Sequence, residues 1–411
     1  MLTGYILLEL AVILLVVQLL GYLCKLVGQQ RVIGEILAGL ALGPTLLGSL
    51  WPHLSLLLFP PKILPTLQTL GDIGLILYMF SLGARLDIHL MLSQSRKAVF
   101  VSLSGIVFPF AIGAVLGYFL YSSMAGAKAT LVSFMLLVGT AMAITAFPVL
   151  ARLLTEKKML GTSVGMLALT CASIDDVIAW CLLALVVAMI HAHGVISVVV
   201  TIGLTILFVA VMLWGVRPLL AYIARRTQSS TFSIIILLLA AYVTNTIGIH
   251  PIFGAFLAGV ILPRNVAFTD QIRKMDQINN ILFLPIFFIF SGLQTQIGLI
   301  QGSGLWLICL LILVLASIGK IAGGTFSSRV MGETWKEALC IGILMNTRGL
   351  VELIVLNIGL QLGVLSPTLF AMLVIMALIT TMMASPILPL LGYRSRASTI
   401  EPEEAIKSGL S

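Results

Sequence analysis

The sequence predicts an all-α polytopic membrane protein of about thirteen transmembrane helices, with inverted six-helix repeats and two broken crossing helices. Of its 411 residues, 60% are hydrophobic and only 9% are charged, and the mean hydropathy is +1.16. So few charges do not make a water-soluble surface. We therefore assign residues 1–392 to a transmembrane domain and residues 393–411 to a short cytoplasmic tail.

The individual spans are apolar runs of roughly 18 to 25 residues, the length that crosses a hydrocarbon core. Glycine, proline and charged residues separate the runs. The predicted spans are residues 4–24, 32–50, 66–84, 98–121, 129–154, 161–190, 195–223, 230–247, 250–263, 278–294, 304–327, 337–363 and 368–391. The span at 250–263 is short, and two others are interrupted.

The 23 Lys and Arg residues indicate the orientation. Nearly all of them fall at span ends on one side of the membrane, the exceptions being Lys62, Lys128, Lys320 and Arg348. By the positive-inside rule this side is cytoplasmic, so we expect a multi-pass protein of the inner or plasma membrane with its N-terminus outside. The net charge of +8 is thus a topology signal, and no nucleic-acid partner is expected.

An internal repeat is visible in the spans. Residues 34–39 (GEILAG) match residues 254–259 (GAFLAG) at four of six positions. The two segments are seven crossings apart, an odd number, so the copies must have opposite orientations. This gives repeat one (1–193), a linking helix (194–229) and inverted repeat two (230–392). Chance similarity between Gly/Ala/Leu-rich helices is the alternative explanation.

Two spans are interrupted at corresponding positions of the two halves. Pro148 breaks the span at 129–154, because it lacks a backbone donor and clashes with the preceding turn. Its mate, the span at 337–363, is interrupted around Asn346 and Arg348. Paired broken helices of this kind indicate a substrate site near the middle of the membrane, where freed carbonyl groups and half-helix ends meet an ion.

Asp175 and Asp176 lie in the middle of the span at 161–190. Ionisable groups at membrane depth are costly, and two neighbouring carboxylates do not both ionise readily in a low dielectric. One or both should therefore hold protons until a cation displaces them. The alternative is a pair buried for packing. Adjacent residues lie about 100° apart on a helix, so one carboxylate can face the ion and the other a basic partner.

Other candidate site residues are polar groups in apolar surroundings. Lys320 is a counter-ion for one aspartate or, alternatively, a side chain that reaches the membrane interface. Arg348 and Glu352, spaced i, i+4, are expected to pair and hold the broken span together, beside Asn346 and Pro148. Asp176 is the predicted binding group for a monovalent cation, and the hydroxyl oxygens nearby are candidate ligands or ordinary helix contacts: Thr145 and Ser173.

The sequence has no GxGxxG motif, Walker motif or Cys/His cluster with metal-ligand spacing. ATP-driven pumping and redox chemistry therefore have no visible basis. We expect neither a cofactor nor an enzymatic activity.

Together, the motifs resemble the second monovalent cation:proton antiporter family, the Kef-like exchangers of bacteria and their plant relatives. The likeness covers nearly the whole chain and is carried by residues 31–39, 144–152, 175–176, 284–288 and 345–352. The resemblance implies an NhaA-type fold, elevator-like alternating access and a homodimer. It also implies that Asp176 binds the cation and that Asp175 pairs with Lys320. Kef potassium-efflux proteins carry glutamine in place of Asp175, so efflux gated by glutathione is not expected.

The function expected from these residues is antiport of Na⁺ or K⁺ against H⁺, serving pH homeostasis, in a homodimer embedded in the lipid bilayer. Cation and protons would compete at the aspartate site. Two alternatives are a gated cation channel, which needs a continuous polar pore, and an ion or pH sensor that transports nothing.

Overall fold

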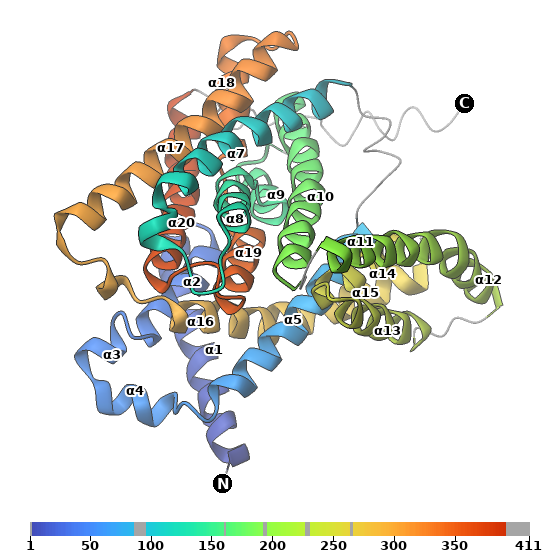
Figure 1. The fold of residues 1–411 in the computed structure, drawn as a ribbon, viewed down its shortest axis with the longest axis horizontal. Coiled ribbons are helices and arrows are strands. Elements are labelled where there is room, and N and C mark those ends of the chain that lie inside the picture. Colours follow the sequence, from blue (N-terminus) through green and yellow to red (C-terminus); the bar gives the residue numbers. More distant parts are fainter. Residues whose placement is uncertain are drawn as a thin grey trace, which may run out of the picture.

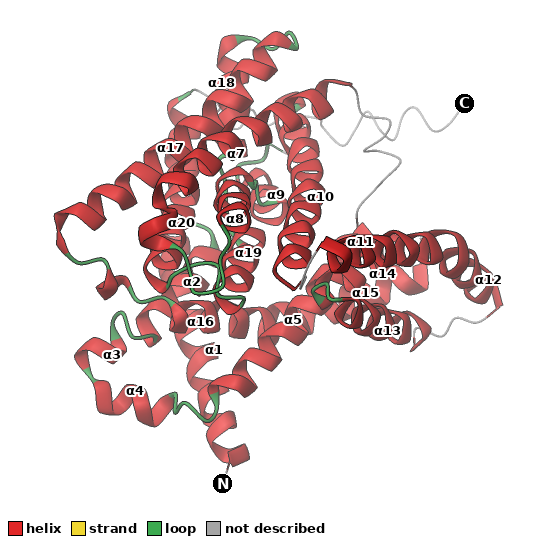
Figure 2. Cartoon of the chain, viewed as in Figure 1, coloured by secondary structure: helices red, strands yellow, loops and turns green. Residues whose placement is uncertain are grey.

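The computed structural model describes residues 2–85, 96–159, 162–191, 195–226, 231–263 and 266–391. Over these ranges the chain is helical and contains no β-strand (Figure 1, Figure 2). The tail predicted at 393–411 lies outside the described residues. An all-helical architecture agrees with the prediction.

The helices follow one another along the chain with short connections. They are α1 (Leu2–Leu26), α2 (Arg31–Leu42), α3 (Leu47–Leu50), α4 (Pro52–Leu58), α5 (Leu64–Arg85), α7 (Arg96–Met124), α8 (Leu131–Ala143), α9 (Phe147–Glu156), α10 (Ser163–His191), α11 (Val195–Ala210), η1 (Val211–Val216), α12 (Arg217–Arg226), α13 (Thr231–Ile247), α14 (Pro251–Val260), α15 (Val266–Ile278), η2 (Asn279–Phe283), α16 (Leu284–Gln294), η3 (Ile297–Leu299), α17 (Gly302–Val330), α18 (Trp335–Met345), α19 (Leu350–Gln361) and α20 (Pro367–Leu390).

Nine helical stretches in the described part of the chain are long and apolar enough to cross a membrane, and the bent pair α18–α19 makes up to ten. Three shorter apolar helices, α8, α13 and α14, lie where further spans were predicted. Short and broken helices do not reach the length of a full crossing on their own. The count of thirteen spans therefore stays a prediction.

The first halves of the two interrupted spans begin in the same way. α8 starts after Thr130, whose side chain accepts from the amide of Ser133 while the Ser133 side chain accepts from the Thr130 amide. α18 starts after Thr334, which makes the same reciprocal pair with Glu337. Such capping boxes satisfy amide groups that have no partner inside the helix, so each half-helix has a fixed starting residue.

The helices pack as two groups. The core group comprises residues 96–191 and 302–390, in which α7 packs on α8 and α17, and α10 packs on α7, α8 and α18. The flanking group comprises residues 2–85 and 231–294, in which α5 packs on α14 and α16, and α2 packs on α1 and α16. Most helix packing is within a group, and Figure 1 shows α5 running from beside α1 toward α14.

Glycines allow two close crossings in the flanking group. A Cβ on Gly292 of α16 would lie 2.2 Å from the carbonyl carbon of Gly39 in α2. A Cβ on Gly259 of α14 would lie 2.0 Å from the carbonyl oxygen of Phe80 in α5. Gly39 and Gly259 occupy matching positions of the predicted repeat, so the same backbone contact occurs twice. An inverted repeat would produce this duplication, although the repeat itself remains a prediction.

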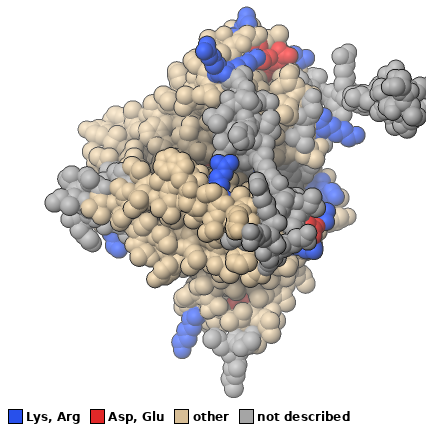
Figure 3. Space-filling view, turned by 90° about the vertical axis from the view of Figure 1, so that its right-hand side faces the viewer, with Lys and Arg blue, Asp and Glu red and all other residues tan. Residues whose placement is uncertain are grey.

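The outer surface suits a lipid environment. Large apolar side chains point outward, including Trp214, 80% exposed, and Phe119, 70% exposed. Charged side chains are sparse over the face that Figure 3 shows. A surface of this composition is stable in hydrocarbon and would aggregate in water.

Candidate functional site

Two interrupted helices meet inside the core group. Residues 144–146 separate α8 from α9, and residues 346–349 separate α18 from α19 with a bend of 41°. The Ala146 amide donates a 3.0 Å hydrogen bond to the carbonyl oxygen of Thr347, which joins the two breaks. The non-helical backbone of these two breaks is buried, so protein surrounds it.

Each break has a local cause in the sequence. Pro148 lies in the first turn of α9, where its missing amide costs nothing but where it cannot continue α8. Asn346 ends α18. Gly349 then has φ 157° and ψ −126°, and a Cβ there would lie 2.6 Å from Cγ2 of Val149. Backbone of this kind is essentially restricted to glycine, so the second break is set by Gly349.

Two fixed cations satisfy the C-terminal carbonyl groups of α8. Arg348 donates from its two terminal nitrogens to the carbonyl oxygens of Ala141, at 2.6 Å, and Met142, at 2.7 Å. Lys320 of α17 donates to the carbonyl oxygen of Ala143. The C-terminal end of a helix carries partial negative charge, and these side chains neutralise it. The carbonyl end of this half-helix is thus already occupied.

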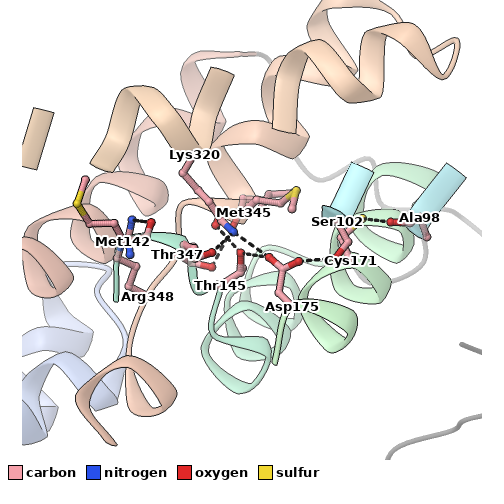
Figure 4. A network of polar contacts seen from close by, with 12 residues as sticks. Ala98, Ser102, Met142, Thr145, Cys171, Asp175, Lys320, Met345, Thr347 and Arg348 are labelled. Atoms are coloured by element: carbon pink, nitrogen blue, oxygen red, sulfur yellow. Dashed lines mark hydrogen bonds and ion pairs between the residues drawn. The ribbon is translucent and has the colours of Figure 1, made fainter. Parts of the chain in front are cut away.

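Asp175 of α10 lies at the centre of a buried polar cluster (Figure 4). Lys320 Nζ is 2.8 Å from Asp175 Oδ2. The hydroxyl of Thr145 lies 2.6 Å from the same oxygen, and the Ser102 hydroxyl donates to Asp175 Oδ1 at 2.6 Å. Lysine and aspartate are both fully buried, so this ion pair and its hydroxyl partners hold α7, α10 and α17 together around the break.

Asp176 has a different environment. Its side chain is only 2% exposed, yet neither carboxylate oxygen accepts a hydrogen bond from the residues that the structure describes. A buried carboxylate without donors requires a proton or a cation as its partner. The two neighbouring aspartates therefore have different surroundings.

The other predicted pair also lies at the crossing. Arg348 and Glu352 are both fully buried, and an Arg348 terminal nitrogen is 3.6 Å from a Glu352 oxygen. The shorter contacts of Arg348 go to the end of α8, and its backbone exchanges hydrogen bonds with the Thr381 hydroxyl of α20. Within the described chain, the side-chain oxygen of Asn346 accepts no hydrogen bond. Arg348 thus connects three segments of the core group.

The two candidate hydroxyl ligands differ in position. The Thr145 hydroxyl contacts Asp175 and also lies 2.9 Å from the carbonyl oxygen of Met345, so it belongs to the Asp175 cluster. Ser173 is half-buried and donates to the carbonyl oxygen of Leu169 on its own helix, at 3.0 Å. Sequence reasoning missed Ser102, because a single serine in an apolar span gives no signal of a partner 73 residues away.

Two cavities lie between the core and flanking groups. The Tyr78 cavity, of about 390 Å³, is lined among others by Arg31, Glu35, Tyr78, Arg85, Val149 and Leu350. The Asp72 cavity, of about 360 Å³, is lined among others by Asp72, Ile76, Asn245, His250, Ile358 and Gln361. The first reaches the beginning of α19 and the second its end, so the cavities approach the interface from opposite sides.

Crossed broken helices around buried charges define the class of membrane proteins that move ions or small solutes through a site near the middle of the bilayer. Residues 11–392 match the family model described as sodium/hydrogen exchanger, transmembrane. The chain belongs to this family.

Related proteins are similar over nearly the whole chain. The Na(+)/H(+) antiporter NhaS4 of Synechocystis sp. is 42% identical over 94% of this chain and 97% of its own length. The K(+)/H(+) antiporter 1 of Saccharomyces cerevisiae is 32% identical over 97% of this chain but only 48% of its own length. The fold is similar to that of the sodium proton antiporter MjNhaP1 from Methanocaldococcus jannaschii, with a TM-score of 0.66, 16% identity and coverage of 93% and 96% of the two chains.

Proposed function

We propose that this protein is a secondary active transporter that exchanges Na⁺ or K⁺ for H⁺, with Asp176 as the group that binds cation and protons in turn. The observation that carries this proposal is the buried Asp176 carboxylate, which has no hydrogen-bond donor among the described residues and lies beside two crossed half-helices. The family supports cation/proton antiport, and the relatives named above are called Na⁺/H⁺ and K⁺/H⁺ antiporters.

Competition at one carboxylate is sufficient to couple the two fluxes. An ionised Asp176 in an apolar site is unfavourable unless a positive charge accompanies it. A bound proton or a bound alkali cation removes that cost, and both cannot be held by the same oxygens. Movement of the core group is then favourable only when the carboxylate is occupied, which prevents a leak of either ion.

Lys320 and Asp175 form an ion pair of zero net charge next to this site. The ammonium group neutralises Asp175 at 2.8 Å, so the incoming cation meets one net negative charge, on Asp176. Thr145 positions Asp175, and Ser173, on the same helix, remains a candidate cation ligand through its hydroxyl oxygen. Release of a proton from Lys320 during the cycle would make exchange electrogenic, and a lysine that stays charged would not.

The two-group packing supports alternating access as part of this proposal. The core group carries Asp176, and the cavities lie on opposite sides along the boundary with the flanking group. Displacement of the core group along that boundary would expose Asp176 to one cavity and then to the other. We include in this proposal the thirteen spans, the inverted repeats 1–193 and 230–392 linked by 194–229, a homodimer in the bilayer, and an external N-terminus in the plasma membrane.

Flux measurements in proteoliposomes test the proposal. The purified full chain is reconstituted with an imposed pH gradient, and gradient dissipation is followed after addition of Na⁺ or K⁺. Wild type should dissipate the gradient with at least one of these ions, and Asp176→Asn should not. Asp270→Asn is the matched control, because Asp270 lies at the surface of α15 and pairs with Arg273 and Lys274.

The two alternative functions give different results in the same preparation. A channel would show unitary currents and cation flux without proton movement. A sensor would bind the cation and move no ion. Either outcome from correctly folded protein would overturn the antiporter proposal.

A further inference from the structure

Helix α5 separates the two cavities. Asp72 and Ile76 of this helix line the Asp72 cavity, whereas Tyr78 and Arg85 line the Tyr78 cavity. Asp72 and Tyr78 are six residues apart, about 9 Å along a helix. α5 packs against α14 and α16, and therefore belongs to the flanking group and not to the group that carries Asp176. One helix of the flanking group thus presents a different polar side chain to each cavity.

Tyr78 of α5 shares its cavity with residues of both broken spans. These are Val149 near the start of α9 and Leu350 at the start of α19. The Tyr78 hydroxyl is buried, and within the described part of the chain it makes no hydrogen bond. The same cavity thus reaches α9, which packs on α10, the helix that carries Asp176. The Tyr78 oxygen is therefore available to a cation that approaches the carboxylate from this side.

Asp72 has the corresponding position in the other cavity. Its carboxylate is partly buried, and amide side chains from two other helices, Asn245 and Gln361, line the same space. His250 is the other titratable residue among those lining this cavity. Carboxylate and amide oxygens are the ligands that hard alkali cations prefer. The Asp72 cavity thus collects oxygen ligands at a point that faces α19 of the core group.

We propose that α5 provides a cation-handling residue for each direction of access: Tyr78 for ions that enter through the Tyr78 cavity, and Asp72 for ions that enter through the Asp72 cavity. Each residue holds a partly dehydrated cation before Asp176 takes it. Because the two residues serve opposite sides, each determines the apparent cation affinity on one side of the membrane only. This inference rests on the proposed exchange at Asp176.

Sided vesicles test the inference. The full chain is expressed in bacteria, and apparent KM values for Na⁺ and K⁺ are measured in everted and in right-side-out membrane vesicles. Tyr78→Phe should raise the apparent KM about fivefold when the cation is added on the side of the membrane to which the Tyr78 cavity opens, the side of Arg31 and Arg85. It should leave the apparent KM on the opposite side of the membrane unchanged. Asp72→Asn should raise it about tenfold on the opposite side only. Asp72→Glu should restore most of the affinity.

Controls separate this inference from the proposed function. Tyr118→Phe, at a position 58% exposed on α7, should change neither KM value. Elution of each variant as a folded species in size-exclusion chromatography checks the fold. Exchange by wild type and its loss in Asp176→Asn would support the proposed function. If Tyr78→Phe and Asp72→Asn then change the apparent KM equally on both sides, or on neither, the inference is wrong and the proposed function stands. Absence of exchange in wild type would instead overturn the proposed function.

Discussion

Substitution of Lys320 by Met should reveal how strongly the Asp175 cluster depends on its ammonium group. The change removes a buried charge that lies 2.8 Å from Asp175 Oδ2 and also donates to the Ala143 carbonyl oxygen. Removing one partner of a buried pair costs about 3 to 5 kcal/mol, because the other charge is left uncompensated. Asp175 keeps two hydroxyl contacts, from Ser102 and Thr145, so the uncompensated carboxylate should cost about 3 kcal/mol, at the low end of this range. The unsatisfied carbonyl adds about 1 kcal/mol.

The total expected loss in the free energy of unfolding is about 4 kcal/mol, measurable by equilibrium unfolding in mixed micelles. The second arm of the experiment is Lys320→Met combined with Asp175→Asn, which removes both charges. If the loss comes from the uncompensated carboxylate, the double variant should recover about 2 kcal/mol relative to the single one. A single substitution that costs less than about 1 kcal/mol, or a double variant whose loss is the sum of the two single losses, would refute the reasoning.

Three further predictions concern packing, the broken helix and pH. Gly292→Ala should lower the free energy of unfolding by about 2 kcal/mol or more through overpacking, because the added Cβ would lie 2.2 Å from the backbone of α2. Gly304→Ala is the control and should be neutral, since a Cβ there meets no atom within 4 Å. Thermal unfolding of the two variants compares them. Arg348→Gln should lower the free energy of unfolding by about 3 kcal/mol or more and abolish flux in proteoliposomes, because it leaves two carbonyl oxygens of α8 and the Glu352 carboxylate without their partner. Unaltered flux would contradict this prediction. Under the proposed competition at Asp176, the apparent KM for the cation should rise as pH falls, by at most about tenfold per pH unit in flux assays. A pH-independent KM would exclude competition.

The sequence predicts the membrane class, the two interruptions and the buried diad from local patterns. Pro148 and Gly349 mark the breaks because they act on their own backbone. Nothing local indicates which aspartate meets the lysine, since Asp175 and Lys320 are 145 residues apart. Helical geometry predicts different roles for adjacent residues but does not assign them. The family resemblance supplies an assignment, and the packing of α10 against α7 and α8 places Asp175 beside Lys320.

Tertiary packing also decides which contacts of Arg348 are short. The i, i+4 spacing predicts its pairing with Glu352, which the structure places at 3.6 Å, but its contacts with Ala141 and Met142 are 2.6 and 2.7 Å long. Those carbonyl groups are available only because α8 ends there, some 200 residues earlier in the chain. The two cavities are likewise absent from any sequence pattern, since each is formed by helices of both groups.

The closeness of the two cavities along α5 has an electrical consequence. Ile76 lines one cavity and Tyr78 the other, so the width of a single helix separates the two cavities at this point. When water and ions fill both cavities, most of the membrane voltage falls across that thin layer. A charge that crosses it gains or loses about 2.3 kcal/mol for each 100 mV, although it moves a small fraction of the bilayer thickness. Under the proposed exchange, displacement of the core group across this layer would move any net charge that it carries through most of the membrane potential.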